Sequence, residues 1–119
     1  MPVATTIRLN AADRLLCVEF DDGTQSFLSA EYLRVESPSA EVQGHGPGQK
    51  RIVPGKSSVA IIGIEPVGNY AVRLLFSDLH DTGIYSWEYL YELGQQQEAR
   101  WNAYLAALQE RGLSRDADK

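Results

Sequence analysis

The side chains of this sequence best suited to chemistry are its two histidines, His45 and His80. Imidazole titrates near neutral pH and binds transition metals, so either could act as an acid, a base or a metal ligand. A zinc or iron site needs three or four ligands, and the nearby carboxylates are Glu41, Asp78 and Asp81. These groups would meet only if the segment around His45 folded back onto His80, which the spacing does not require. The alternative is that His80 is a solvated loop residue whose charged form is stabilised by its acidic neighbours.

Two further patterns suggest catalysis or phosphate binding, and both lack the residues that would complete them. Ser37 and Ser39 could pair with a histidine as nucleophile and base, but no G-x-S-x-G elbow or oxyanion loop accompanies them. The glycine-rich run 44–50 ends in a lysine, yet it lacks the G-x-x-x-x-G-K-[ST] spacing of a phosphate loop. We therefore predict no catalytic and no cofactor-binding residues.

Composition narrows the possible partners. The net charge is −5 and the basic residues are scattered, which argues against general binding of nucleic acid or anionic membrane. Cys17 is the only cysteine, so the chain has no intramolecular disulfide and no thiolate cluster. We see neither a secretory signal nor an apolar stretch of about 18 residues. These features predict a cytoplasmic protein that binds neither nucleic acid nor membrane.

Alternating and continuous apolar runs, joined by turn signals, predict two antiparallel hairpins. The turn of the first contains Asp22-Gly23, a strong signal for a type I′ turn with positive φ at both central residues. The turn of the second contains Gly68-Asn69. The strands are expected over residues 5–9, 15–20, 25–28, 59–64, 71–76 and 83–85.

Two serines are well placed to begin helices. Ser29 would cap a short helical turn over 30–33, and Ser86 would cap a helix over 87–93. Gly94 has the residue type that commonly terminates a helix. A longer helix is expected over residues 95–111, with one core-facing stripe formed by Trp101, Tyr104, Leu105 and Leu108.

The resulting fold class is α+β: a small, mainly antiparallel β domain with a short helix and a longer C-terminal helix. We place a single domain at residues 1–112 and a disordered tail at 113–119. Residues 37–56 contain three prolines and four glycines, which predicts a long irregular loop. A loop of that length in a compact domain is usually functional or mobile.

The aromatic side chains after this loop offer a second kind of site. Tyr85, Tyr89 and Tyr91, together with His45 in the loop, are candidates for a protein-binding surface, because aromatic residues are enriched at interfaces. Packing into the core is the alternative use of these rings, and Trp87 is expected to be packed in that way.

Four segments of the sequence together resemble one family, the gamma-butyrobetaine hydroxylase-like N-terminal domain. They are 31–34 (EYLR), 37–42 (SPSAEV), 67–72 (VGNYAV) and the block from His80 through 83–90 (GIYSWEYL). The resemblance covers about residues 5–105. In that family the domain precedes the oxygenase domain of gamma-butyrobetaine and trimethyllysine hydroxylases, occurs beside iron–sulfur scaffold ATPases, and stands alone in short bacterial proteins of unknown role. The resemblance is to this last group, and the chain has no room for an oxygenase domain.

The resemblance also implies a metal site and identifies its positions. The hydroxylases hold zinc through three cysteines spaced C-x-C-x-x-C and a later histidine. The matching positions here are Ser37, Ser39, Val42 and His80. Serine hydroxyls are poor zinc ligands and valine cannot bind zinc at all, so we expect the family's zinc to be absent.

These observations predict a non-catalytic domain that binds another protein, of unknown identity, and that could form a homodimer. The alternative is a metal-binding accessory protein, with zinc or iron at His80, linked to iron–sulfur or iron handling. A third possibility is a module that binds a small molecule.

Overall fold

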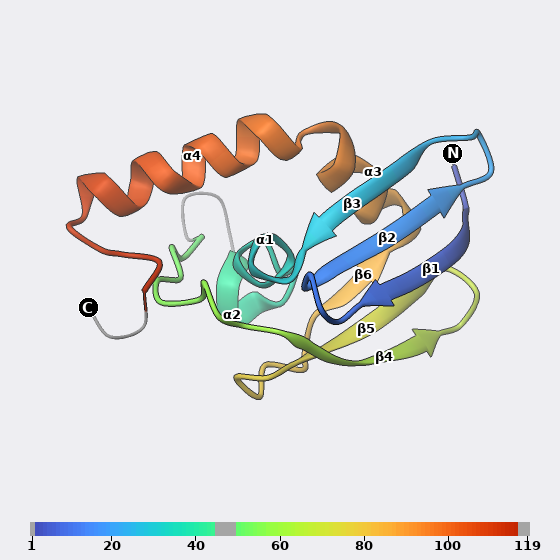
Figure 1. The fold of residues 1–119 in the computed structure, drawn as a ribbon, viewed down its shortest axis with the longest axis horizontal. Coiled ribbons are helices and arrows are strands. Elements are labelled where there is room, and N and C mark those ends of the chain that lie inside the picture. The colour runs from blue at the N-terminus through green and yellow to red at the C-terminus, as the bar shows by residue number, and fades with distance from the viewer. Residues whose placement is uncertain (1, 45–49, 117–119) are drawn as a thin grey trace.

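A computed structural model describes residues 2–44 and 50–116 of the 119-residue chain. Within these ranges it has six strands and four helices (Figure 1). Sheet A is formed by β1 (Ala4–Asn10), β2 (Leu15–Phe20) and β3 (Gln25–Ser29), and sheet B by β4 (Ile61–Val67), β5 (Ala71–Phe76) and β6 (Ile84–Ser86). The helices are α1 (Ala30–Val35), α2 (Ala40–Gln43), α3 (Trp87–Gln95) and α4 (Gln97–Glu110).

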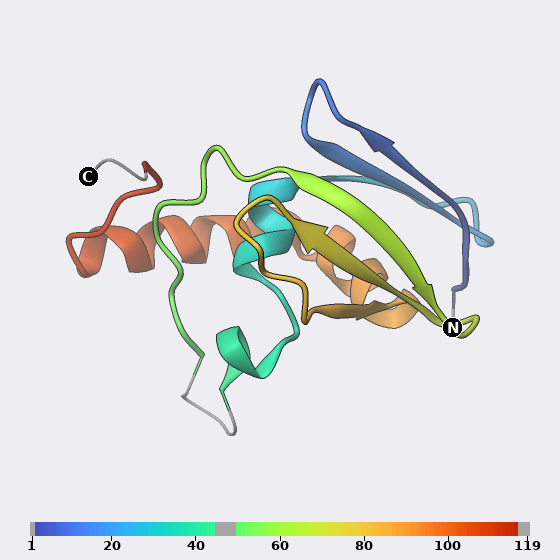
Figure 2. The same ribbon diagram turned by 90° about the horizontal axis from the view of Figure 1, so that it is seen from below.

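Both sheets are antiparallel, with the chain-order topology of simple meanders. Their inner faces share one hydrophobic core, which α1 and α3 complete (Figure 2). The core-facing strand residues include Leu16, Val18 and Leu28 from sheet A, and Val72, Leu74, Phe76 and Tyr85 from sheet B. The predicted α+β class, with its longer C-terminal helix, is therefore confirmed.

Helix α4 extends beyond this core (Figures 1 and 2). Tyr104 and Leu108 are buried, and Trp101 and Leu105 pack beside them against Val35, in a second and smaller cluster. The predicted stripe of α4 thus faces the protein as expected.

Three predicted details of the turns and ends are wrong. Only Gly23 has a positive φ (87°) at the first hairpin turn, so this turn is not type I′. Strand β4 begins at Ile61 rather than Val59, because the N–H of Val59 is already used in a turn, where it bonds to the carbonyl of Lys56. Gly94 lies inside α3 rather than after it.

The reason for glycine at position 94 is close packing. A Cβ added there would lie 2.2 Å from the hydroxyl oxygen of Ser26 on β3. Gly94 therefore lets α3 lie directly against sheet A, which only the tertiary structure reveals.

The segment expected to be one irregular loop contains a short helix, α2. Ser39 is its N-cap, and its hydroxyl accepts a hydrogen bond from the N–H of Glu41. Within the segment 113–119 that was predicted to be a disordered tail, the carbonyls of Ser114 and Arg115 accept hydrogen bonds from Gly55 and Ser57. Residues 117–119 lie outside the described residues.

Candidate functional site

The turn between β5 and β6 brings His80 against the segment that joins α1 to α2. His80 Nε2 lies 2.9 Å from Ser37 Oγ, and His80 Nδ1 lies 3.3 Å from Glu41 Oε2. The hydroxyl oxygens of Ser39 and Thr82 are 2.8 Å apart, and Thr82 donates to Glu41. We call these five residues the serine–histidine cluster. The structure therefore brings together His80, Ser37 and Ser39, which the sequence analysis singled out.

The order Ser37–His80–Glu41 is that of a nucleophile, a base and a carboxylate, but the Ser37 hydroxyl is closed off. Ser37 is fully buried, and only 2% of the His80 side chain is exposed. Gly83 covers the hydroxyl so closely that a Cβ there would lie 2.6 Å from Ser37 Oγ. A reacting carbonyl would have to reach about 3–3.5 Å from that oxygen, and the covering backbone leaves no space for it. The cluster is built to hold two segments together.

The histidine of this cluster is electrically neutral near pH 7. Burial lowers the pKa of His80, and the Arg34 guanidinium lowers it further, against the opposing effects of Glu41 and Asp78. Although the Glu41 carboxylate is close, it is poorly aligned, and Nδ1 of His80 has no well-formed hydrogen bond. The cluster thus contains one buried nitrogen that a small shift of Glu41 could satisfy.

Asp78 anchors the same turn from its other side. Its carboxylate lies 2.8 Å from Arg34 Nε and 2.7 Å from Lys56 Nζ, and it accepts a hydrogen bond from the N–H of His80. Burial acts to raise the pKa of Asp78, but the hydrogen bonds from Lys56, His80 and Arg34 outweigh it and lower the pKa to about 2. Asp78 therefore joins α1, the 50–56 segment and the turn.

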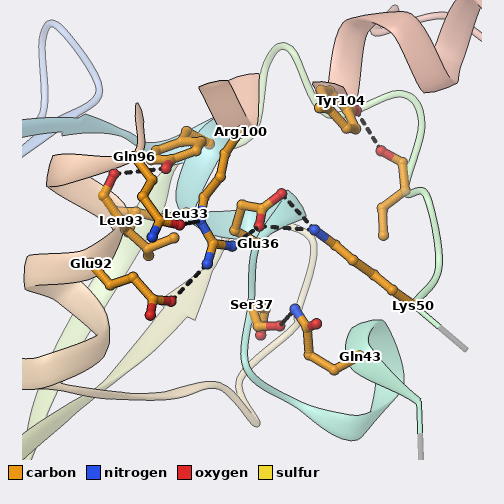
Figure 3. A network of polar contacts seen from close by, with 12 residues as sticks. Leu33, Glu36, Ser37, Gln43, Lys50, Glu92, Leu93, Gln96, Arg100 and Tyr104 are labelled. Carbon is orange, nitrogen blue, oxygen red and sulfur yellow. Dashed lines mark hydrogen bonds and ion pairs between the residues drawn. The ribbon is translucent and has the colours of Figure 1, made fainter. Parts of the chain in front are cut away.

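A second polar network surrounds Glu36, the residue that follows α1 (Figure 3). Its side chain is 3% exposed and lies between two cations. Lys50 Nζ is 2.9 Å from both carboxylate oxygens, and Arg100 of α4 approaches one of them at 2.7 Å. Arg100 also pairs with Glu92 of α3, and Gln43 donates to the carbonyl of Ser37. The two networks thus meet in the segment after α1.

The predicted aromatic surface is not a free surface. Tyr85 is fully buried in the core, and its hydroxyl donates to the carbonyl of Leu33, so its assignment to a partner surface is wrong. Tyr89 is half-buried and donates to the carbonyl of Glu36; burial raises its pKa to about 12. Tyr91 is half-buried and donates to Asp22. His45 lies outside the described residues.

The large apolar side chains that are exposed lie elsewhere. Leu79, in the β5–β6 turn, is 84% exposed, and Ile62 of β4 is 63% exposed. Ile84 of β6 is 46% exposed, so sheet B and its turn carry three such residues. Leu79 also has a φ of 73°, in the left-handed region that favours glycine. The sequence analysis missed Leu79, because nothing in the sequence alone marks its backbone conformation.

Comparison with known proteins places the chain in a family. The sequence profile of the family described as gamma-butyrobetaine hydroxylase-like, N-terminal, matches residues 7–91. The chain belongs to this family. Among curated proteins, none matches it. As a gamma-butyrobetaine hydroxylase-like N-terminal domain, the chain matches the family from within β1, through the other five strands, α1 and α2, to the first part of α3.

Solved structures agree with this assignment. One NMR solution structure is 44% identical with a TM-score of 0.87, and the match covers 100% of this chain and 94% of that one. A second NMR solution structure is 50% identical with a TM-score of 0.84, over 97% and 86% of the two chains. A crystal structure from Acidithiobacillus ferrooxidans ATCC 23270, of a protein of unknown function in the DUF971 family, is 43% identical with a TM-score of 0.65, over 76% and 91%.

The four positions that the family resemblance links to zinc do not fit that metal in this domain. Val42 is apolar and 1% exposed, and so offers no ligand atom. Ser37 and His80 bond directly to each other, and Ser39 bonds to Thr82. In residues 2–44 and 50–116, no group of three or more His, Cys, Asp or Glu side chains is placed to hold a metal ion. Hydrogen bonds occupy the place where the resemblance implies a metal.

One further property concerns the membrane. Across the described ranges, no helix is long and apolar enough to cross a bilayer.

Proposed function

We propose that this domain is a non-catalytic accessory module that binds another protein through the exposed apolar side chains of sheet B and its β5–β6 turn. The observation that carries the proposal is the backbone conformation of Leu79. A non-glycine residue in the left-handed region costs about 1–2 kcal/mol, and here that residue is also a leucine, 84% exposed. Neither the left-handed backbone conformation nor the exposure of this leucine stabilises the isolated domain.

The surroundings of Leu79 support a rigid contact. The turn is closed by hydrogen bonds from the N–H groups of Phe76 and Leu79 to the carbonyls of His80 and Phe76. Asp78 and His80 tie it to α1 and to the segment after it. Because these contacts already hold the turn in one conformation, its exposed apolar side chain loses little conformational entropy on binding. The contacts of Asp78 and His80 then serve to present this side chain.

Ile62 extends the same surface. Ile61 is paired with Phe76, the last residue before the turn, so the irregularity that exposes Ile62 lies at the turn's end of sheet B. Apolar side chains at that end would form the water-excluded centre of an interface, and the Glu65–Arg73 ion pair on the neighbouring strands would lie near its polar rim.

The test separates stability from binding. Leu79→Gly is expected to leave the melting temperature unchanged or to raise it, because glycine adopts the left-handed conformation without strain. The same substitution should reduce the recovery of protein partners in a quantitative pull-down from cell extract, compared with wild type. Phe27→Ser is the matched control, since Phe27 is 53% exposed on sheet A, away from the turn. Equal recovery by wild type and Leu79→Gly would refute the proposed surface.

A second candidate function is metal binding at His80, as zinc or iron, in an accessory protein. It is favoured by one observation, the buried Nδ1 atom of His80 that lacks a hydrogen bond and lies 3.3 Å from the Glu41 carboxylate. A native mass spectrum of protein purified without chelator tests it. Bound metal that is lost in His80→Ala would support this function over the first, and an apo mass would refute metal binding at His80.

A further inference from the structure

The chain that follows α4 turns back and lies beside the segment 55–57 (Figures 1 and 2). Gly112 ends the helix with a φ of 64°, and the N–H of Leu113 bonds to the carbonyl of Leu108. Two backbone hydrogen bonds, from Gly55 to Ser114 and from Ser57 to Arg115, then fix the direction of the chain. The result is that the Arg115 side chain points back over α1 and α4.

The Arg115 guanidinium is recognised in three ways at once. Its Nε and Nη2 atoms donate to the two carboxylate oxygens of Glu31, at 2.8 and 2.7 Å. Its central carbon lies 5.3 Å from the centre of the Trp101 ring, within the range of a cation–π contact. A planar, forked contact to a carboxylate combined with stacking on an indole is selective for guanidinium over ammonium. Glu31 and Trp101 therefore form a guanidinium cradle.

Glu31 and Arg115 differ in burial and in the kind of segment that carries them. The Glu31 side chain is 7% exposed and belongs to α1, in which four of the other five residues are buried. The Arg115 side chain is 47% exposed and is carried by a short non-helical segment. The cradle would stay in place if Arg115 moved away, and a buried carboxylate would then lack its cation. Such a carboxylate gains much from a replacement cation.

There is also room beside the cradle for something larger than one side chain. A hollow of about 620 Å³ adjoins it, lined by Glu31, Tyr32, Gln95, Glu98, Trp101 and Arg115. Glu98 adds a second carboxylate, and the Trp101 ring adds an apolar wall. A group that enters through this hollow would meet the same carboxylate and the same indole as Arg115 does.

We propose that the Glu31–Trp101 cradle is a binding site for an external guanidinium group, and that Arg115 occupies it while no ligand is bound. The ligand is an arginine side chain of another polypeptide or a small guanidinium compound. Arg115 then acts as an internal competitor, whose effective concentration weakens ligand binding without preventing it. This site is separate from the exposed apolar side chains of sheet B and its β5–β6 turn, so the guanidinium site and the proposed protein-binding surface can each be refuted alone.

The test uses the full-length chain and the Arg115→Ala variant. Methylguanidinium chloride is titrated into each while the indole N–H signals of Trp101 and Trp87 are followed by two-dimensional NMR. In Arg115→Ala we expect a saturable shift of the Trp101 signal, at least about tenfold tighter than in wild type, because the internal competitor has been removed. The Trp87 signal is the internal control, because Trp87 begins α3 whereas the hollow is lined by Gln95 at the end of that helix.

Two comparisons establish the chemistry. Methylammonium chloride should bind at least about tenfold more weakly than methylguanidinium, because it cannot make the forked contact. The double variant Glu31→Gln/Arg115→Ala should lose saturable binding, since the glutamine preserves shape and removes the charge. The same spectra show whether each variant is folded, and Arg115→Gln replaces Arg115→Ala if the latter is not.

The source of the guanidinium is decided by a third titration, with the blocked peptide acetyl-Gly-Arg-Gly-amide. Tighter binding of the peptide than of methylguanidinium would identify an arginine in a polypeptide, and equal binding would identify a small compound. No saturable shift of Trp101 with either guanidinium probe in the folded Arg115 variants would overturn the proposal. Binding unchanged by Glu31→Gln would overturn it as well.

Discussion

Arg100→Met tests whether the Glu36 network holds α4 to α3 and to the segment after α1. Arg100 Nη1 lies 2.7 Å from a Glu36 oxygen, and the Glu36 side chain is 3% exposed. Methionine retains much of the apolar packing of the arginine stem and removes only the charged group. The buried carboxylate would then have a single cation, Lys50, whose side chain is 39% exposed.

The size of the effect follows from this geometry. Breaking a buried ion pair by removal of one partner costs about 3–5 kcal/mol when nothing else compensates the remaining charge. Lys50 still bonds to both oxygens at 2.9 Å, so we expect roughly half of that, about 2 kcal/mol. For a domain of this size, this is a decrease in melting temperature of about 8 °C.

The assay is urea unfolding of a double-mutant cycle with Glu36→Gln and Arg100→Met. Because both substitutions remove the same interaction, the double variant should cost at least about 1 kcal/mol less than the sum of the single variants. Glu92→Gln is the control, since Glu92 pairs with Arg100 but its side chain is 44% exposed, and it should cost less than about 1 kcal/mol. Additive single effects, or an Arg100→Met effect no larger than that of Glu92→Gln, would refute the reasoning.

Two further predictions concern acid stability and helix packing. The pKa of Asp78 is lowered to about 2 in the folded protein, so between pH 4 and pH 2 this carboxylate is protonated more readily in the unfolded chain. The free energy of unfolding should therefore decrease by up to about 2 kcal/mol as the pH falls through this window. Asp78→Asn should be less stable at neutral pH and lack this part of the acid dependence in urea titrations at successive pH values; a retained dependence would contradict the assignment. Gly94→Ala should destabilise the domain by about 1–3 kcal/mol, although alanine favours helix, because the added methyl group would lie 2.2 Å from the Ser26 hydroxyl. Thermal melts should show that Ser26→Gly restores much of the loss, and a Gly94→Ala variant as stable as wild type would show that α3 can move away from β3.

The strands and long helix could be predicted because their signals are local. A continuous apolar run identified β2 and alternation of apolar residues identified β5, and Ser29 and Ser86 are observed as the N-caps that were expected. Gly94 was misassigned because its role depends on Ser26, a residue 68 positions earlier on another element. A sequence pattern records only that a glycine is present, and a helix end is the commoner reason for it.

The candidate site was only partly predictable for the same reason. Ser37 and His80 could be placed together from the family resemblance, and the structure joins them at 2.9 Å. Glu36, Arg100 and Arg115 are ordinary charged residues in the sequence, and burial and pairing, which give them their roles, come from contacts across the fold. No sequence pattern indicated the role of Leu79, because its left-handed backbone conformation is set by the hydrogen-bonded turn around it.

The burial of Glu36 has a consequence for the order of events during synthesis of the chain. Arg100, one of its two cations, lies 64 residues later and leaves the ribosome after both sheets have been made. Until then a compact N-terminal part would enclose a carboxylate with only Lys50 beside it. Native closure around α1 is therefore disfavoured in the nascent chain and becomes favourable once α4 has formed. The last helix to be synthesised would then determine when the first helix reaches its final packing.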